Sequence, residues 1–167
     1  MKFSDALVKN WPIPDNYLIE VGRMSALWSS LEGQLNVGIG KLAGFDDVAD
    51  PTPFILLVHS SFPQRLDVLG ALCEQLAPHA PGLAQYKETI SQLRAAQQLR
   101  NRYVHNGMHY EEGTCYISEG SARGKVKVSV SPVTIAELRE VSEAIHLAML
   151  ALHQLITGKT YAPMWER

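Results

Sequence analysis

The sequence predicts an all-α fold, a bundle of four helices with a short β-hairpin inserted before the last helix. Apolar residues recur at alternating steps of three and four along four long stretches, which is the spacing of one helical face. Capping residues and glycine stops bound these stretches, and two short alternating runs flank a glycine-bounded loop. A length of 167 residues suits one hydrophobic core. We therefore expect a single domain, 1–167, with the insert at about 108–130.

The first helix is expected to begin at Asp15, which offers a cap, and to end at Lys41-Leu42-Ala43-Gly44, where glycine supplies a stop. Its inner face carries apolar residues at helical spacing: Val21, Met24, Trp28, Leu31, Leu35 and Leu42. Gly33, Gly38 and Gly40 each lower helix propensity by about 1 kcal/mol relative to alanine. They indicate either the close approach of another helix or a kink.

The middle of the chain contains one short and two long predicted helices. The run from Phe54 to Val58 is short and uniformly apolar, so we expect a short buried helix there. Ser61 and Gln64 have capping-box spacing, which predicts a second long helix. Its inner face would carry Leu66, Leu69, Leu72, Cys73 and Leu76. The third long helix is expected to open at Pro81-Gly82 and to close at a left-handed stop, Asn106-Gly107.

The hairpin and the last helix follow. Thr114 to Ser118 and Lys125 to Val130 alternate as β-strands do, around the basic, exposed loop Gly120 to Gly124. Thr134-Ile135-Ala136-Glu137 is a second capping box, and the apolar spacing beyond it predicts a fourth helix that ends near residue 158. The apolar tail, residues 161–165, is expected to dock on the body or on a second subunit.

Composition and charge exclude several classes of protein. A formal net charge of −2 means that any RNA contact must come from a local basic cluster, since phosphate binding otherwise requires a basic protein. Cys73 and Cys115 have no zinc-site spacing and are predicted to be reduced structural thiols. No window approaches about 20 consecutive apolar residues, and the first eleven residues lack a signal-length apolar core. We expect a cytoplasmic protein with no membrane span, no metal and no cofactor.

Arg100, Asn101 and His105 stand at the closing turn of the third helix and are the one candidate for chemistry in the sequence. Arg100 falls on the face that should be buried, so it needs an acid partner such as Glu20 or Glu32, or an open cleft. Five helical residues leave Arg100 and His105 about 140° apart around the axis. The arginine's reach, a distorted last turn, or the same helix of a second subunit could bring them together. We favour the second subunit.

The arrangement Arg100-Asn101-x-x-x-His105 at the end of the third long helix of a bundle resembles the HEPN superfamily. Two runs, Gln64 to Asp67 and Leu99 to Arg102, are also similar to runs in small bacterial proteins. The HEPN resemblance implies a homodimer in which catalytic members cut RNA without a metal. Others bind nucleotides or only mediate association. It implies that His105 is the acid or base and Arg100 the electrostatic clamp, with Asn101 orienting the imidazole.

These residue types suit that chemistry, because imidazole exchanges protons near neutral pH and a guanidinium stabilises charge on a phosphate. If the hairpin folds beside the motif, basic and aromatic side chains can form a surface for single-stranded RNA: Arg94, Arg102, Tyr103, Tyr110, Tyr116, Arg123, Lys125 and Lys127. Taken separately, the charged side chains are typical of a solvated surface.

A structural interpretation remains open, because arginine, histidine and asparagine are all common at helix C-termini. The chain would then be a non-catalytic interaction or nucleotide-binding protein, with a partner protein such as an antitoxin.

Overall fold

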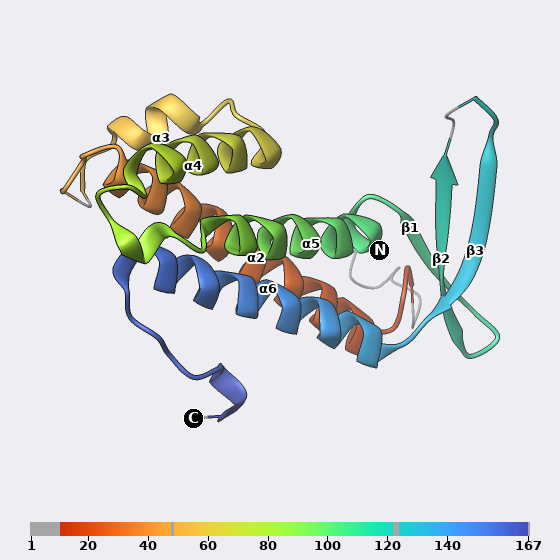
Figure 1. The fold of residues 1–167 in the computed structure, drawn as a ribbon. Coiled ribbons are helices and arrows are strands. Elements are labelled where there is room, and N and C mark those ends of the chain that lie inside the picture. The colour runs from red at the N-terminus through yellow and green to blue at the C-terminus, as the bar shows by residue number, and fades with distance from the viewer. Residues whose placement is uncertain (1–10, 48, 122–123, 167) are drawn as a thin grey trace. The chain divides into compact units, whose positions relative to one another are not determined.

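The computed structural model describes residues 11–47, 49–121 and 124–166. Over these residues the chain is mostly helical, with a small antiparallel sheet before the last helix (Figure 1). The helices are α2 (Asp15–Leu42), α3 (Thr52–Leu57), α4 (Phe62–Leu76), α5 (Tyr86–Val104) and α6 (Ile135–Thr157). The strands are β1 (Gly107–Glu111), β2 (Thr114–Ser121) and β3 (Lys127–Val133), and 3₁₀ turns form at Pro81–Leu83 and Met164–Glu166.

The described chain groups into two compact units. The sheet unit comprises residues 11–26 and 97–143, and the helical unit comprises residues 27–96 and 144–166. Helices α2, α5 and α6 each contribute residues to both units. Five α-helices are thus present in the part of the chain that the structure describes, where the sequence predicted four and a short fifth segment. The expectation of one domain stays a prediction.

The predicted helix signals lie where the helices begin and end. At α4, the Ser61 amide donates to Gln64 Oε1 at 2.8 Å and the Gln64 amide donates to Ser61 Oγ, so the capping box is complete. At α6, the Thr134 amide donates to Glu137 Oε2 at 2.6 Å and the Glu137 amide donates to Thr134 Oγ1 at 3.2 Å. Gly44, at φ 91°, follows the end of α2 as expected for a C-terminal stop.

The core of the helical unit consists of the apolar faces predicted from helical spacing. Fully buried leucines come from four helices: Leu31, Leu35, Leu66, Leu69, Leu93 and Leu152. The rings of Trp28 and Phe62 lie 4.5 Å apart and tie α2 to the start of α4. A Cβ on Gly38 would lie 3.1 Å from Ile156 of α6, and one on Gly40 would lie 2.7 Å from Pro53 of α3. These two glycines therefore permit close packing, whereas a Cβ on Gly33 would meet no atom of another element within 4 Å.

The C-terminal tail docks on α6 within the helical unit. The Met164 amide donates to His146 Nε2 at 3.1 Å. The Trp165 ring lies 5.3 Å from the His146 ring, and the Tyr161 ring lies 5.1 Å from His153. This confirms the expectation that the tail contacts the body of the protein.

Two helix predictions need correction. Helix α3 forms, but it is not buried: Leu57 is the one buried residue in it, and Ile55 and Leu56 are 63% and 67% exposed. The apolar run was sufficient to indicate a helix but not to say what covers it. The third long helix starts at Tyr86, because Pro81–Leu83 forms a separate 3₁₀ turn.

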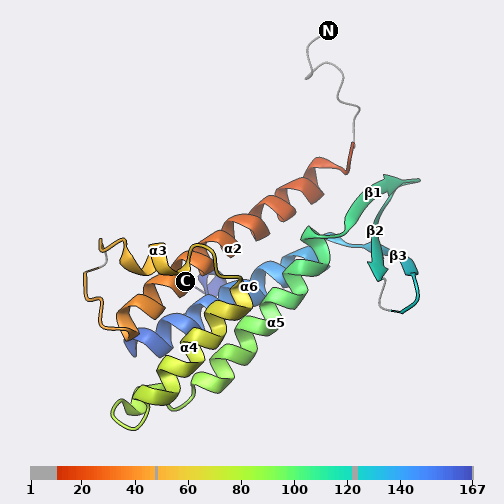
Figure 2. The ribbon, with the colours of Figure 1, turned by 90° about the horizontal axis from the view of Figure 1, so that it is seen from above.

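The insert is a three-stranded antiparallel sheet in the order β1-β2-β3, rather than the two-stranded hairpin predicted (Figures 1 and 2). Strand β1 begins at Gly107, directly after α5, and pairs Gly107 with Ser118. Gly107 therefore lies in a strand and is not the expected left-handed stop. The next residues with left-handed backbone are Glu112 and Gly113, in the β1–β2 turn. Sequence reasoning missed β1 because the Asn-Gly pair resembled the end of a helix.

Two further features follow the sequence. Both cysteines are free thiols and both are buried, as predicted for structural residues. None of the helices in the described residues is long and apolar enough to span a membrane.

Candidate functional site

The site predicted from the sequence lies at the C-terminal end of α5, in the sheet unit. Arg100 and Asn101 belong to the last turn, and His105 is the first residue after the helix. The chain leaves the helix there because β1 starts two residues later. The side-chain amide of Asn106 donates to the Arg102 carbonyl at 2.7 Å, which satisfies one of the last helical carbonyls.

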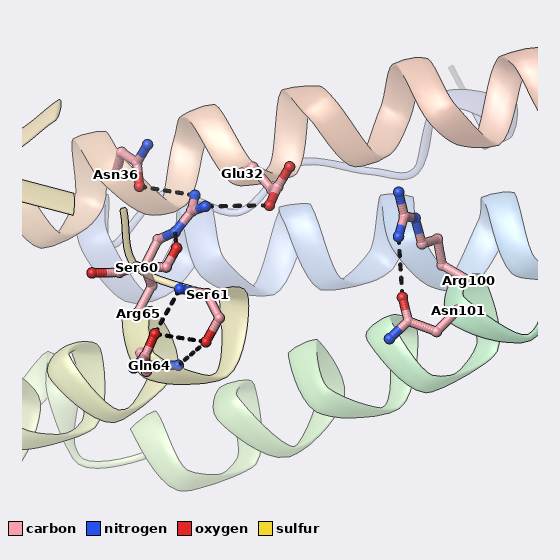
Figure 3. A network of polar contacts seen from close by, with 8 residues as sticks. All are labelled: Glu32, Asn36, Ser60, Ser61, Gln64, Arg65, Arg100 and Asn101. Atoms are coloured by element: carbon pink, nitrogen blue, oxygen red, sulfur yellow. Dashed lines mark hydrogen bonds and ion pairs between the residues drawn. The ribbon is translucent and has the colours of Figure 1, made fainter. Parts of the chain in front are cut away.

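Arg100 and His105 converge within one chain. Arg100 Nη1 lies 3.4 Å from His105 Nε2 and donates to Asn101 Oδ1 at 3.1 Å (Figure 3 shows the second contact). The convergence results from the length of the arginine side chain and from the end of the helix at Val104. The same helix of a second subunit, which we favoured from the sequence, is not needed for it.

The hydrogen-bonding roles in this cluster follow from chemistry. A guanidinium only donates, so the Arg100 contact requires Nε2 of His105 to accept, with the ring proton on Nδ1. The exposed imidazole can therefore take a proton from a ligand, and the half-buried guanidinium beside it can bind an anion. The Asn101 oxygen accepts from Arg100, so its amide positions the guanidinium instead of orienting the imidazole as expected.

The two carboxylates considered as partners for Arg100 pair with other arginines. Glu20, which is 3% exposed, accepts from Arg139 Nε at 2.9 Å and also pairs with Arg23. The Arg139 hydrogen bond, opposed by burial and assisted by Arg23, holds the pKa of Glu20 below its usual value. Glu32 belongs to the helical unit, where Arg65 Nη2 lies 3.5 Å from its carboxylate (Figure 3).

The expected RNA surface is only partly assembled. Arg102 donates to Glu119 at 3.2 Å and to Ser131 at 3.4 Å, so its charge is balanced by an acid in the sheet. Arg94 belongs to the helical unit and pairs with Asp67 at 2.7 Å. Tyr103 is 5% exposed, which leaves no ring face open for a base to stack on.

The remaining described members of that predicted surface lie in the sheet or beside it. Lys125 and Lys127 are exposed, as predicted, while Arg123 lies outside the described residues. Tyr116 stacks on His109 with ring centroids 5.5 Å apart. Tyr110 alternates with His109 along β1 and so lies on the opposite face of the sheet. The aromatic residues therefore do not form one continuous platform.

Sequence reasoning missed a cavity of about 530 Å³ in the helical unit, between α2, α3 and the start of α4. Arg65, with a side chain 13% exposed, lies in its lining. Its guanidinium donates to the Ser60 carbonyl at 3.1 Å and to Asn36 Oδ1 at 3.3 Å (Figure 3). The capping box beside Arg65 marked a helix start but gave no sign of a cavity.

Comparison with known proteins identifies no family: no family model matches the chain, no curated protein matches it, and no solved structure matches its fold. Among the described residues, no group of three or more His, Cys, Asp or Glu side chains is placed to hold a metal ion.

Proposed function

We propose that this chain is a HEPN-like endoribonuclease that cleaves RNA without a metal ion. The observation that carries the proposal is the approach of Arg100 Nη1 to within 3.4 Å of His105 Nε2 at an exposed helix end. A general base, His105, and a permanent cation, Arg100, can then act on the same phosphodiester. The proposal takes α2, α4, α5 and α6 as the four helices of a HEPN-like bundle, with α3 and the sheet as additions.

The reaction follows from the roles of the two side chains. A phosphate that binds Arg100 offers the guanidinium charge-assisted hydrogen bonds, which are stronger than its 3.4 Å contact with a neutral imidazole. His105 Nε2 then accepts the proton of the ribose 2′-hydroxyl as the 2′-oxygen attacks phosphorus. The bond from phosphorus to the 5′-oxygen breaks, and that oxygen takes a proton from water. The products are a 2′,3′-cyclic phosphate and a 5′-hydroxyl, and His105 returns its proton to solvent.

Arg100 would act on the charge that grows on the phosphate oxygens. Asn101 is a positioning residue, because its oxygen fixes the guanidinium through the 3.1 Å hydrogen bond. The HEPN resemblance also implies a homodimer, and within the proposal each chain supplies its own Arg100 and His105.

The test is cleavage of a mixed RNA pool by the purified protein in excess chelator. We expect His105→Ala to reduce the rate by about 10²- to 10⁴-fold, as for loss of a general base. Arg100→Ala should reduce it by about 10²- to 10³-fold. A substrate with 2′-deoxyribose at the cut site should not react, because it lacks the attacking oxygen.

The chain offers matched controls for both variants. His109→Ala removes an exposed histidine four residues further along, and Lys159→Ala removes an exposed cation just beyond the end of α6. Both should cleave as the wild type does. No cleavage by the wild type, or equal activity in His105→Ala, would contradict the proposal. Nucleotide binding without cleavage would instead favour the non-catalytic alternative.

A further inference from the structure

Helix α3 exposes an apolar surface that the residues described by the structure leave uncovered. Phe54, Ile55, Leu56 and Val58 are 59%, 63%, 67% and 46% exposed. A helix that is apolar on all sides is normally buried, and exposed apolar clusters of this kind on a folded protein mark interaction sites. We call these four residues, with the cavity beside them, the α3 surface.

The α3 surface has an acidic rim. Asp46, Asp47 and Asp50 line the same cavity as Phe54 and Val58. The cavity lining holds four carboxylates in all, those three and Glu32, against two cations, Lys41 and Arg65. Arg65 already lies 3.5 Å from Glu32 and bonds to Asn36. The excess of negative charge beside exposed hydrocarbon selects a partner that is both apolar and cationic.

The same chain carries an exposed segment of that chemistry. Val126, Val128 and Val130 are 80%, 70% and 57% exposed, and Lys125 and Lys127 between and beside them are exposed as well. We call residues 125–130 the β3 stripe. Strand β3 is an edge of the sheet, with β2 on one side and no other described strand on the other. Open, apolar edge strands are prone to association with another chain.

We propose that the β3 stripe of one copy of this chain docks on the α3 surface of a second copy. Val128 and Val130 share one face of β3, and Lys127 lies on the other face. In the proposed contact, the edge of the strand brings the valines to the apolar side chains of α3 and the lysines to the acidic rim. Because the two surfaces are different patches, the contact is heterologous: two such contacts can close a dimer, or the contacts can continue from copy to copy. The proposal goes beyond the proposed function and does not rest on it, so its test needs no RNA.

The test is the mass of the full chain in sedimentation velocity over a concentration series. We expect the wild type to associate at low salt and to associate less in high salt, since screening weakens charge pairs at a surface. Asp46→Lys with Asp47→Asn should weaken association at least tenfold. Asparagine is chosen because Asp47 Oδ1 accepts from the Ala49 amide at 2.8 Å, which asparagine can preserve.

The reciprocal variant provides the sharper result. Lys125→Glu with Lys127→Glu should also weaken self-association at least tenfold. An equimolar mixture of the two variants should associate again, because the unchanged stripe of the first variant then meets the unchanged rim of the second. The reversed stripe also meets the reversed rim. Val128→Thr with Val130→Thr, which keeps β-propensity but removes hydrocarbon, should weaken association without changing charge.

The matched control is Glu74→Lys with Glu88→Gln, which makes the same change in net charge at exposed acids that do not line the α3 cavity. This control should associate as the wild type does, and circular dichroism should show that every variant is folded. A monomeric wild type at all concentrations overturns the proposal. So does a control that weakens association equally, or a variant mixture that fails to associate.

Discussion

Substitution of Gly40 by alanine tests how closely α3 packs on α2. An alanine Cβ at this position would lie 2.7 Å and 2.9 Å from two ring carbons of Pro53. A proline ring is tied to its backbone and cannot turn away, so α3 or α2 must shift. Gly33 in the same helix is the matched control, because a Cβ added there would meet no atom within 4 Å.

The two substitutions should change stability in opposite directions. Gly33→Ala gains helix propensity, about 1 kcal/mol at an interior position. Gly40→Ala gains part of this helix propensity, but it overpacks the contact with Pro53, which costs about 1–3 kcal/mol. We therefore expect Gly40→Ala to be less stable than Gly33→Ala by about 1–3 kcal/mol. For a chain of this length, that difference corresponds to about 2–12 °C in melting temperature.

Urea unfolding followed by circular dichroism at helical wavelengths measures the difference. The double variant Gly40→Ala/Pro53→Ala should recover part of the lost stability, with a coupling of at least about 0.5 kcal/mol. Equal stability of Gly40→Ala and Gly33→Ala would refute the close packing of Pro53 on Gly40.

Three further predictions follow from particular contacts. Thr134→Ala removes the cap shared with Glu137 and should lower the free energy of unfolding by about 0.5–2 kcal/mol in urea titrations; an unchanged midpoint would contradict the cap. Because the pKa of Glu20 is lowered in the folded state, ionised Glu20 stabilises the fold above pH 4.5. This stabilisation is lost as the pH falls below 4.5 and Glu20 takes up a proton. Wild-type stability should therefore fall more steeply with acid than that of Glu20→Gln, and parallel pH curves would exclude this. Burial raises the pKa of Cys73 to about 11, so about one Cys73 thiol in a thousand is ionised at pH 8. Disulfide reagents should therefore label Cys73 only in denaturant. Rapid labelling of the native protein would contradict the burial of this thiol.

The sequence by itself determined the helices and most of their ends. Two capping boxes, Ser61 with Gln64 and Thr134 with Glu137, were sufficient to predict the starts of α4 and α6. A capping box forms hydrogen bonds to backbone groups within one turn and needs no contact with residues distant in the sequence. Helical spacing likewise predicted Leu31, Leu66 and Leu93 as core, since burial of one face follows from periodicity.

Tertiary structure decided whatever depends on contacts between distant residues. Strand β1 exists because Gly107 pairs with Ser118, eleven residues away, and that pairing overrides the local stop signal at Asn106.

The candidate site divides in the same way. Its residues and its place at a helix end followed from the sequence, but the convergence of Arg100 and His105 depends on side-chain reach beyond a helix that ends at Val104. Likewise, the apolar run of α3 indicated a helix, and only the fold showed that Ile55 and Leu56 remain exposed, because exposure depends on what else packs there.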